Sequence, residues 1–92
     1  MHAQERDLGI FAALIQRFEH FRLPRILHLK DKVDSGKTLS NSDIHYISGS
    51  LGRTRQILPL IDRHPEYQSF ASRTLQLYIH IVSKGLENEE AR

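Results

Sequence analysis

The 92-residue sequence has no cysteine, no tryptophan, a single methionine and no long run of apolar residues. Without cysteine the chain has no disulfide, no thiol nucleophile and no thiolate ligand for zinc. Its apolar runs are too short to span a bilayer, and the polar, mixed-charge N-terminus lacks the features of a signal peptide. We therefore expect a cytoplasmic protein with no membrane contact.

The chain also has little net charge. Thirteen basic and eleven acidic residues leave a formal charge of +2, whereas nucleic-acid-binding domains usually carry a concentrated basic face. From the scaling of surface with mass, a chain of 10.7 kDa buries about 10,000 Å² on folding, which suffices for one small core. We predict a single domain over residues 1–92, with frayed ends at 1–6 and 87–92.

The strongest pattern is a 3.6-residue period of apolar residues, which is typical of amphipathic helices. It occurs in four segments, at about residues 8–22, 23–34, 41–64 and 65–86. Proline disfavours the helix interior, so Pro24 predicts either two helices or one helix with a kink near 22–23. The sequence therefore predicts an all-α fold: a small antiparallel bundle of four helices, or of three if the first two are one kinked helix.

Local signals mark the ends of these helices. Gly36 is suited to the left-handed conformation that ends a helix. Ser40 followed by Asp43 is typical of a capping box at a helix start. Pro65 ends the third helix and suits the first turn of the fourth.

The apolar residues of each segment are our predicted core, and the fourth segment has the widest apolar arc, about 200°. We therefore expect the fourth helix to be the most buried. The predicted core residues are Leu8, Phe11, Leu14, Ile15, Phe18 and Phe21; Ile26, Leu27, Leu29 and Val33; Ile44, Ile47, Leu51, Thr54, Leu58 and Ile61; and Tyr67, Phe70, Ala71, Leu75, Leu77, Tyr78, Ile79, Ile81, Val82 and Leu86.

Two glycines, Gly49 and Gly52, fall inside the third helix, where each costs about 1 kcal/mol relative to alanine. We expect them to allow close approach of a neighbouring helix or to break the third helix.

The six histidines call for a test of metal and phosphotransfer chemistry. No histidine has an acidic residue three positions before it, as helical Glu-x-x-His metal sites require. We predict no metal and no cofactor; His28 with Asp31 is the first place to look for an ion, and His80 for phosphoryl transfer. No nucleophile, base and orienting residue occur at a plausible spacing, so we predict no catalytic residues and no enzymatic activity.

A second seam runs along the back of the third helix, at steps of three and four residues. A surface helix needs only one apolar face, so this seam predicts either cover by the first or second helix or contact with a partner helix, most simply a second copy. Its residues are Tyr46, Gly49, Arg53, Gln56 and Leu60.

The leading hypothesis is therefore a small non-enzymatic helical adaptor or regulatory protein that binds another protein, or itself, through this second seam. An alternative hypothesis is a nucleic-acid-associated protein with a basic face formed by Arg22, Arg25, Lys32, Arg53 and Arg55. A third is a phosphotransfer or metal-binding bundle. The sequence alone indicates no protein family.

Overall fold

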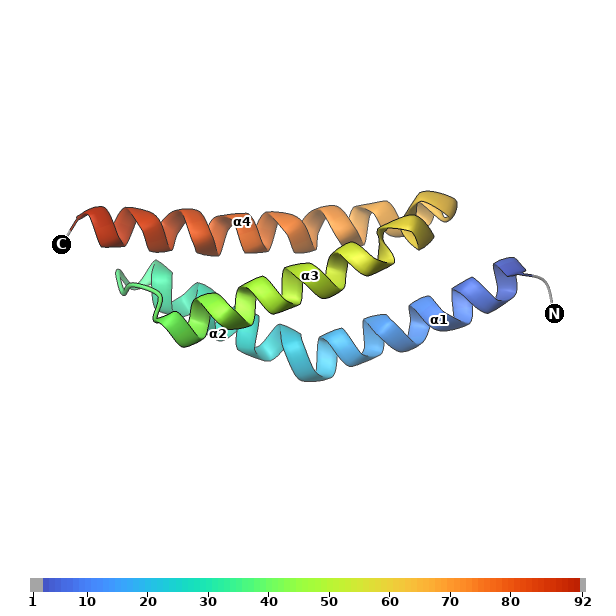
Figure 1. The fold of residues 1–92 in the computed structure, drawn as a ribbon, viewed down its shortest axis with the longest axis horizontal. Coiled ribbons are helices and arrows are strands. Elements are labelled where there is room, and N and C mark those ends of the chain that lie inside the picture. Colours follow the sequence, from blue (N-terminus) through green and yellow to red (C-terminus); the bar gives the residue numbers. More distant parts are fainter. Residues whose placement is uncertain (1–2, 92) are drawn as a thin grey trace.

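The computed structural model describes residues 3–91, without the side chains of residues 3–5, 7 and 60. The chain is 90% helical and the described part has no strand, which confirms the all-α prediction. The first helix is continuous and comprises α1 (Ala3–Arg17), the π-helix η1 (Phe18–Arg22) and α2 (Leu23–Asp34). After it come α3 (Asn41–Arg63), the 3-10 turn η2 (Pro65–Tyr67) and α4 (Gln68–Glu90), as Figure 1 shows.

The described chain thus forms three helices, so the prediction of four is wrong and the alternative of one kinked helix is correct. Pro24 explains the kink, because it has no N–H for the carbonyl of His20 and its ring crowds that carbonyl. In η1 the N–H of Leu23 donates to the carbonyl of Phe18, five residues back, which gives a wider turn. From this turn α1 runs back toward the start of α4 (Figure 1), where Phe11 contacts Tyr67.

The predicted boundaries at the end of α2 and at both ends of α3 are confirmed, whereas the first helix begins earlier than predicted, at Ala3, and α4 ends later, at Glu90. The Asp43 N–H donates to the Ser40 hydroxyl and the Ser40 N–H donates to the Asp43 carboxylate, which completes the capping box. Gly36 has a φ of 94° after α2. The third helix ends at Arg63, directly before His64 and Pro65.

The third helix is continuous through Gly49, Gly52 and Pro59. Both glycines are exposed, and a Cβ atom at either would meet nothing within 4 Å. The expectation of a close helix approach or a break at these glycines is therefore wrong. Pro59 is also exposed, so water can bond to the backbone carbonyl that the proline leaves without a helical partner.

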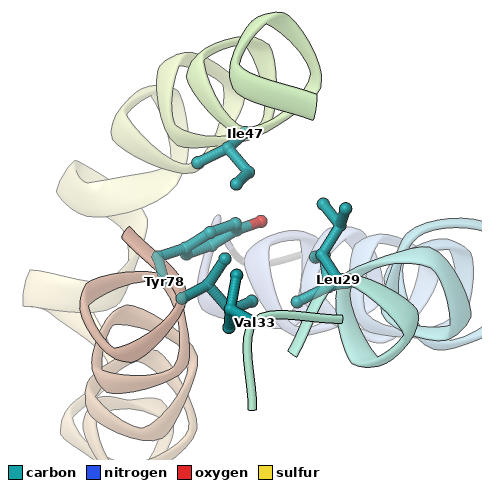
Figure 2. Close-up of a cluster of buried hydrophobic side chains, with 6 residues drawn as sticks. Leu29, Val33, Ile47 and Tyr78 are labelled. Atoms are coloured by element: carbon teal, nitrogen blue, oxygen red, sulfur yellow. The ribbon is translucent and has the colours of Figure 1, made fainter. Parts of the chain in front are cut away.

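The main core lies where α2, α3 and α4 meet. Figure 2 shows Tyr78 of α4 reaching between Ile47 of α3 and the α2 residues Leu29 and Val33. A smaller cluster joins α1 to the other end of the bundle. The main core is Ile26, Leu29, Val33, Ile47, Tyr78 and Ile81, and the smaller cluster is Phe11, Ile61 and Ala71.

Several residues that we expected in the core are exposed. In this arrangement α4 packs mainly on α2 and α3, which cover only part of its wide apolar arc, so several apolar residues of the helix that we expected to be the most buried lie exposed. In η1, Phe21 is 78% exposed because the wider turn alters its angular position. The exposed members of the predicted core are Phe21, Leu27, Ile44, Leu58, Leu75, Ile79, Val82 and Leu86.

The molecule is elongated, with extents of 55 × 20 × 17 Å. Its radius of gyration is 15.1 Å, against about 12 Å for a compact domain of this length. Its accessible surface is 6469 Å², against about 5,500 Å² expected for a compact monomer of this mass. The chain therefore exposes roughly 1,000 Å² more than a compact monomer would. Within residues 3–91, no helix combines the length and apolarity that a bilayer crossing requires.

The ends of the chain were expected to fray. Residues 1, 2 and 92 lie outside the described part, and residues 3–6 and 87–90 are helical. At the C-terminal end, the Asn88 amide donates to the carbonyls of Val33 and Lys37, each at 2.8 Å, which ties α4 to the end of α2.

Candidate functional site

A row of exposed apolar residues lies on α3 and α4, and we call it the α3–α4 face. On α4, Leu75, Ile79, Val82 and Leu86 follow at steps of four, three and four residues, so they lie within an arc of about 60°. The exposed fractions of Ile79 and Leu86 are 64% and 59%. With two exposed residues of α3, the face is Ile44, Leu58, Leu75, Ile79, Val82 and Leu86.

The contacts of α3 place this face on the outside of the bundle. Tyr46 contacts the α1–α2 helix, and Ile44 lies about 160° around α3 from it. Because Leu58 is fourteen residues after Ile44, the two share one side of the helix, about 40° apart. The short turn η2 makes α3 and α4 antiparallel neighbours (Figure 1).

The border of the α3–α4 face on α4 is polar. Along most of the helix it is uncharged, with Ser72, Gln76 and Ser83 exposed, and near the C-terminal end it includes the exposed Glu87 and Glu90. An apolar strip with a polar rim is typical of protein-binding surfaces.

A second feature is a cavity of about 450 Å³ between α1, α3 and α4, which we call the arginine cleft. It lies on the side of α1 and η1 that faces α3 and α4. Its volume lies within the range of small-molecule pockets. The lining residues are Phe11, Leu14, Ile15, Arg17, Phe18, Arg22, Arg53, Thr54, Gln56, Ile57, Ile61, Tyr67, Phe70, Ala71 and Thr74.

Aromatic contacts hold α1 and η1 to the rest of the bundle at this cleft. The Phe11 ring stacks on Tyr67 with centroids 4.4 Å apart and meets the His64 ring edge-on at 5.6 Å. Phe18, the first residue of η1, meets Phe70 edge-on with ring centroids 5.8 Å apart. The two anchors are seven residues apart, about 10 Å along a helix.

The predicted second seam of α3 is divided between α2 and the cleft. The Tyr46 hydroxyl donates to the Arg22 carbonyl at 3.4 Å, and the Arg25 guanidinium lies 4.1 Å from the centre of the Tyr46 ring. Arg53 and Gln56 line the arginine cleft and are exposed. Gly49 is exposed, and the Leu60 side chain lies outside the described residues. Contact of this seam with a partner stays a prediction.

The predicted basic residues do not gather on one face. Lys32 forms an ion pair with Asp43, and Arg25 is occupied by the Tyr46 ring described above. Arg22 and Arg53 line the arginine cleft, whereas Arg55 lies about 160° around α3 from Arg53. The structure thus divides the predicted patch into separate environments.

His80, the phosphotransfer candidate, is paired. Its Nε2 lies 2.7 Å from Asp34 Oδ1, and Lys30 Nζ donates to Asp34 Oδ2 at 2.7 Å. The hydrogen bonds from Lys30 and then His80 hold the pKa of Asp34 below its usual value. This network joins α2 to α4, so Lys30, Asp34 and His80 have a structural role in holding the two helices together.

The metal candidate His28 lies with Asp31 beside a second, shallower hollow that Lys32, Ser35 and Lys37 also line. Two ammonium groups so close disfavour a cation. Among the described side chains, no group of three or more histidine, aspartate and glutamate residues could hold a metal ion.

Sequence reasoning missed both the cleft and a set of buried polar groups. Ser50 of α3 is fully buried and faces the interior with Tyr78. Burial raises the pKa of the Tyr78 hydroxyl, although nearby Ser50 and the charge of Arg22 act in the opposite direction. The one available signal for an uncovered surface was the width of the apolar arc on α4, which exceeds what two neighbouring helices cover.

No protein-family model, no curated protein and no solved structure matches the chain.

Proposed function

We propose that this protein is a non-enzymatic helical adaptor that acts by protein–protein interaction through the α3–α4 face, and that the first partner of this face is a second copy. The observation that carries the proposal is the exposed row of Leu75, Ile79, Val82 and Leu86. Alternating steps of three and four residues are the spacing by which helices pack on one another. When such a row is exposed to water in a monomer, it does not stabilise the fold.

The size of the face fits a stable interface. Each of α3 and α4 has 23 residues, about 35 Å of helix, and packed helices lie about 8–10 Å apart. The two helices together offer about 700 Å², near the 800 Å² that each partner contributes to an interface of standard size. This area is comparable with the surface that the chain exposes beyond a compact monomer.

The apolar row is also complementary to itself. If α4 pairs antiparallel with α4 of a second copy about a two-fold axis between Ile79 and Val82, these two residues face each other across the axis. Leu75 then faces Leu86, so all four layers are apolar. Near the axis the border residues Ser72, Gln76 and Ser83 are uncharged, so they bring no like charges together. A second copy therefore matches the apolar row of α4.

The remaining parts of the proposal rest on the sequence. The absence of a nucleophile, base and orienting residue at a plausible spacing supports a non-enzymatic role. The lack of cysteine fits a reducing, cytoplasmic setting.

Sedimentation analysis of the wild type and two variants tests the proposal. Ile79→Glu places a charge at the centre of the face, and Gln76→Glu adds the same charge three residues away, at the border. We expect the wild type and the Gln76→Glu variant to be dimeric. Ile79→Glu should raise the dissociation constant of the dimer at least about 100-fold, because the new charge is desolvated in the interface without a partner.

Circular dichroism and thermal unfolding serve as the folding control. Ile79 is exposed in the single chain, so Ile79→Glu should keep its helical signal. A wild type that stays monomeric at millimolar concentration, or a Ile79→Glu chain that dimerises as well as Gln76→Glu, overturns the proposal.

A further inference from the structure

The arginine cleft has a chemically divided lining. Nine of its fifteen lining residues are aliphatic or aromatic, three are arginines, and none is an aspartate or glutamate. In a chain with eleven acidic residues, a lining with three cations and no carboxylate gives the cleft a clear positive potential. The cleft therefore combines an apolar wall with a positive opening.

Two of the three uncharged polar lining residues use their hydroxyl protons within their own helices. The Thr54 hydroxyl donates to the Ser50 carbonyl and the Thr74 hydroxyl donates to the Phe70 carbonyl, each at 2.9 Å. Water in a cavity needs two to four polar partners, and an apolar wall does not supply them. An apolar ligand segment is the better occupant of this part of the cleft.

The arginines come from both sides of the cleft. Arg17 and Arg22 belong to the first helix and Arg53 belongs to α3. Arg17 and Arg53 are exposed as well as lining, so they lie at the opening. None of the three forms a salt bridge with another side chain in the described part of the chain. Guanidinium groups bind carboxylates and phosphates through paired hydrogen bonds.

We propose that the arginine cleft binds an anionic amphiphile, a small molecule with an apolar chain and a carboxylate or phosphate head. The chain lies against the wall formed by residues such as Ile15, Ile57 and Phe70, and the head lies between Arg17 and Arg53. Arg53 lies about 140° around α3 from Leu58, so the charged opening of this site is separate from the α3–α4 face.

Calorimetric titration with three ligands of equal chain length tests the proposal: decanoate and decyl phosphate, each below the concentration at which it forms micelles, and decanol, below its solubility limit. We expect saturable one-to-one binding of at least one anion, with decanol at least about tenfold weaker because it forms no charge-assisted hydrogen bonds. The tighter of the two anions identifies the head group. Equal binding of decanol, or no saturable binding of either anion, overturns the proposal.

A matched pair of variants locates the site. Arg53→Glu reverses a charge at the cleft, and Arg55→Glu makes the same change on the same helix about 160° away. We expect Arg53→Glu to weaken anion binding about tenfold or more and Arg55→Glu to change it less than about twofold. Equal effects of the two variants would mean that the anion responds to net charge alone, and would overturn the assignment to the cleft.

Two further variants test the chain-binding wall and the independence from dimerisation. Leu14→Trp, at a half-buried lining position, enlarges the side chain and should abolish binding of all three ligands while the helical signal is kept. Ile79→Glu should bind the anion as the wild type does, because it changes only the α3–α4 face. Loss of anion binding in Ile79→Glu, or full binding in Leu14→Trp, contradicts the proposed site.

Discussion

The two halves of the bundle are packed differently. In the closed half, formed by α2, the start of α3 and the end of α4, six large residues are at most 3% exposed. In the open half, formed by α1, the end of α3 and the start of α4, the buried cluster has three residues and the arginine cleft separates the helices. The change between the halves occurs at η1, where Pro24 turns the first helix.

This difference shows that one helix kink can divide a small bundle into a part that provides stability and a part that provides a surface. In the closed half, Asn88, Asp34 and Lys32 connect α2 to α3 and α4. In the open half, aromatic contacts at Phe11 and Phe18 carry the attachment of α1. A ligand cleft is compatible with such an attachment because removing a few contacts there leaves the closed core intact.

Truncating one isoleucine in each half gives the largest expected contrast. Ile81 is fully buried in the closed half, so Ile81→Ala should lower the free energy of unfolding by about 3–4 kcal/mol. Ile57 is half-buried at the cleft, and its side chain already lacks neighbours on one side, so Ile57→Ala should cost about 1 kcal/mol. Urea denaturation measures both; equal losses would show that α1 closes over the cleft in solution.

The sequence predicted local structure well because local structure depends on neighbouring residues. The capping box of Ser40 and Asp43, the left-handed Gly36 and the kink before Pro24 all follow from short patterns. The number of neighbours that α4 has does not follow from its own residues. Periodicity therefore placed Ile79 in the core, although no helix of this chain covers it.

Glycine-to-alanine substitutions give the next contrast, between one helical glycine that packs against a side chain and one that faces open space. A Cβ atom at Gly85 would lie 2.8 Å from Cδ1 and 2.9 Å from Cγ of Leu39, so Gly85→Ala should destabilise the closed half by about 1 kcal/mol. At Gly52 a Cβ atom meets nothing within 4 Å, so Gly52→Ala should stabilise α3 by about 0.5–1 kcal/mol. Thermal unfolding measures both, and stabilisation by Gly85→Ala would show that Leu39 moves away at little cost.

The candidate surfaces were harder to predict than the helices because they depend on how helices are placed relative to each other. The seam of Tyr46, Arg53 and Gln56 was correctly identified as a second row on α3, but the sequence did not show that α2 covers Tyr46 while Arg53 faces a cavity. Arg17 joins Arg53 only because η1 redirects α1. No sequence pattern within the first helix or within α3 specifies that Arg17 and Arg53 line the same cleft.

Acid should weaken the closed half slightly more than the open half. Burial raises the pKa of Asp43, but hydrogen bonds from Lys32 and Ser40 outweigh it, so the pKa lies below its usual value. A carboxyl group with a lowered pKa stabilises the fold at pH above its unfolded value, and this contribution is lost as pH falls through its folded value. We expect the free energy of unfolding to fall by about 1 kcal/mol on acidification from neutral pH to about pH 3, the size of a helix cap.

Asp43→Asn should lower stability at neutral pH and flatten this dependence, whereas Asp62→Asn, at the exposed end of α3 in the open half, should keep the wild-type slope. Urea midpoints measured across this pH range provide the check, and identical slopes for the two variants would assign the acid sensitivity to other groups.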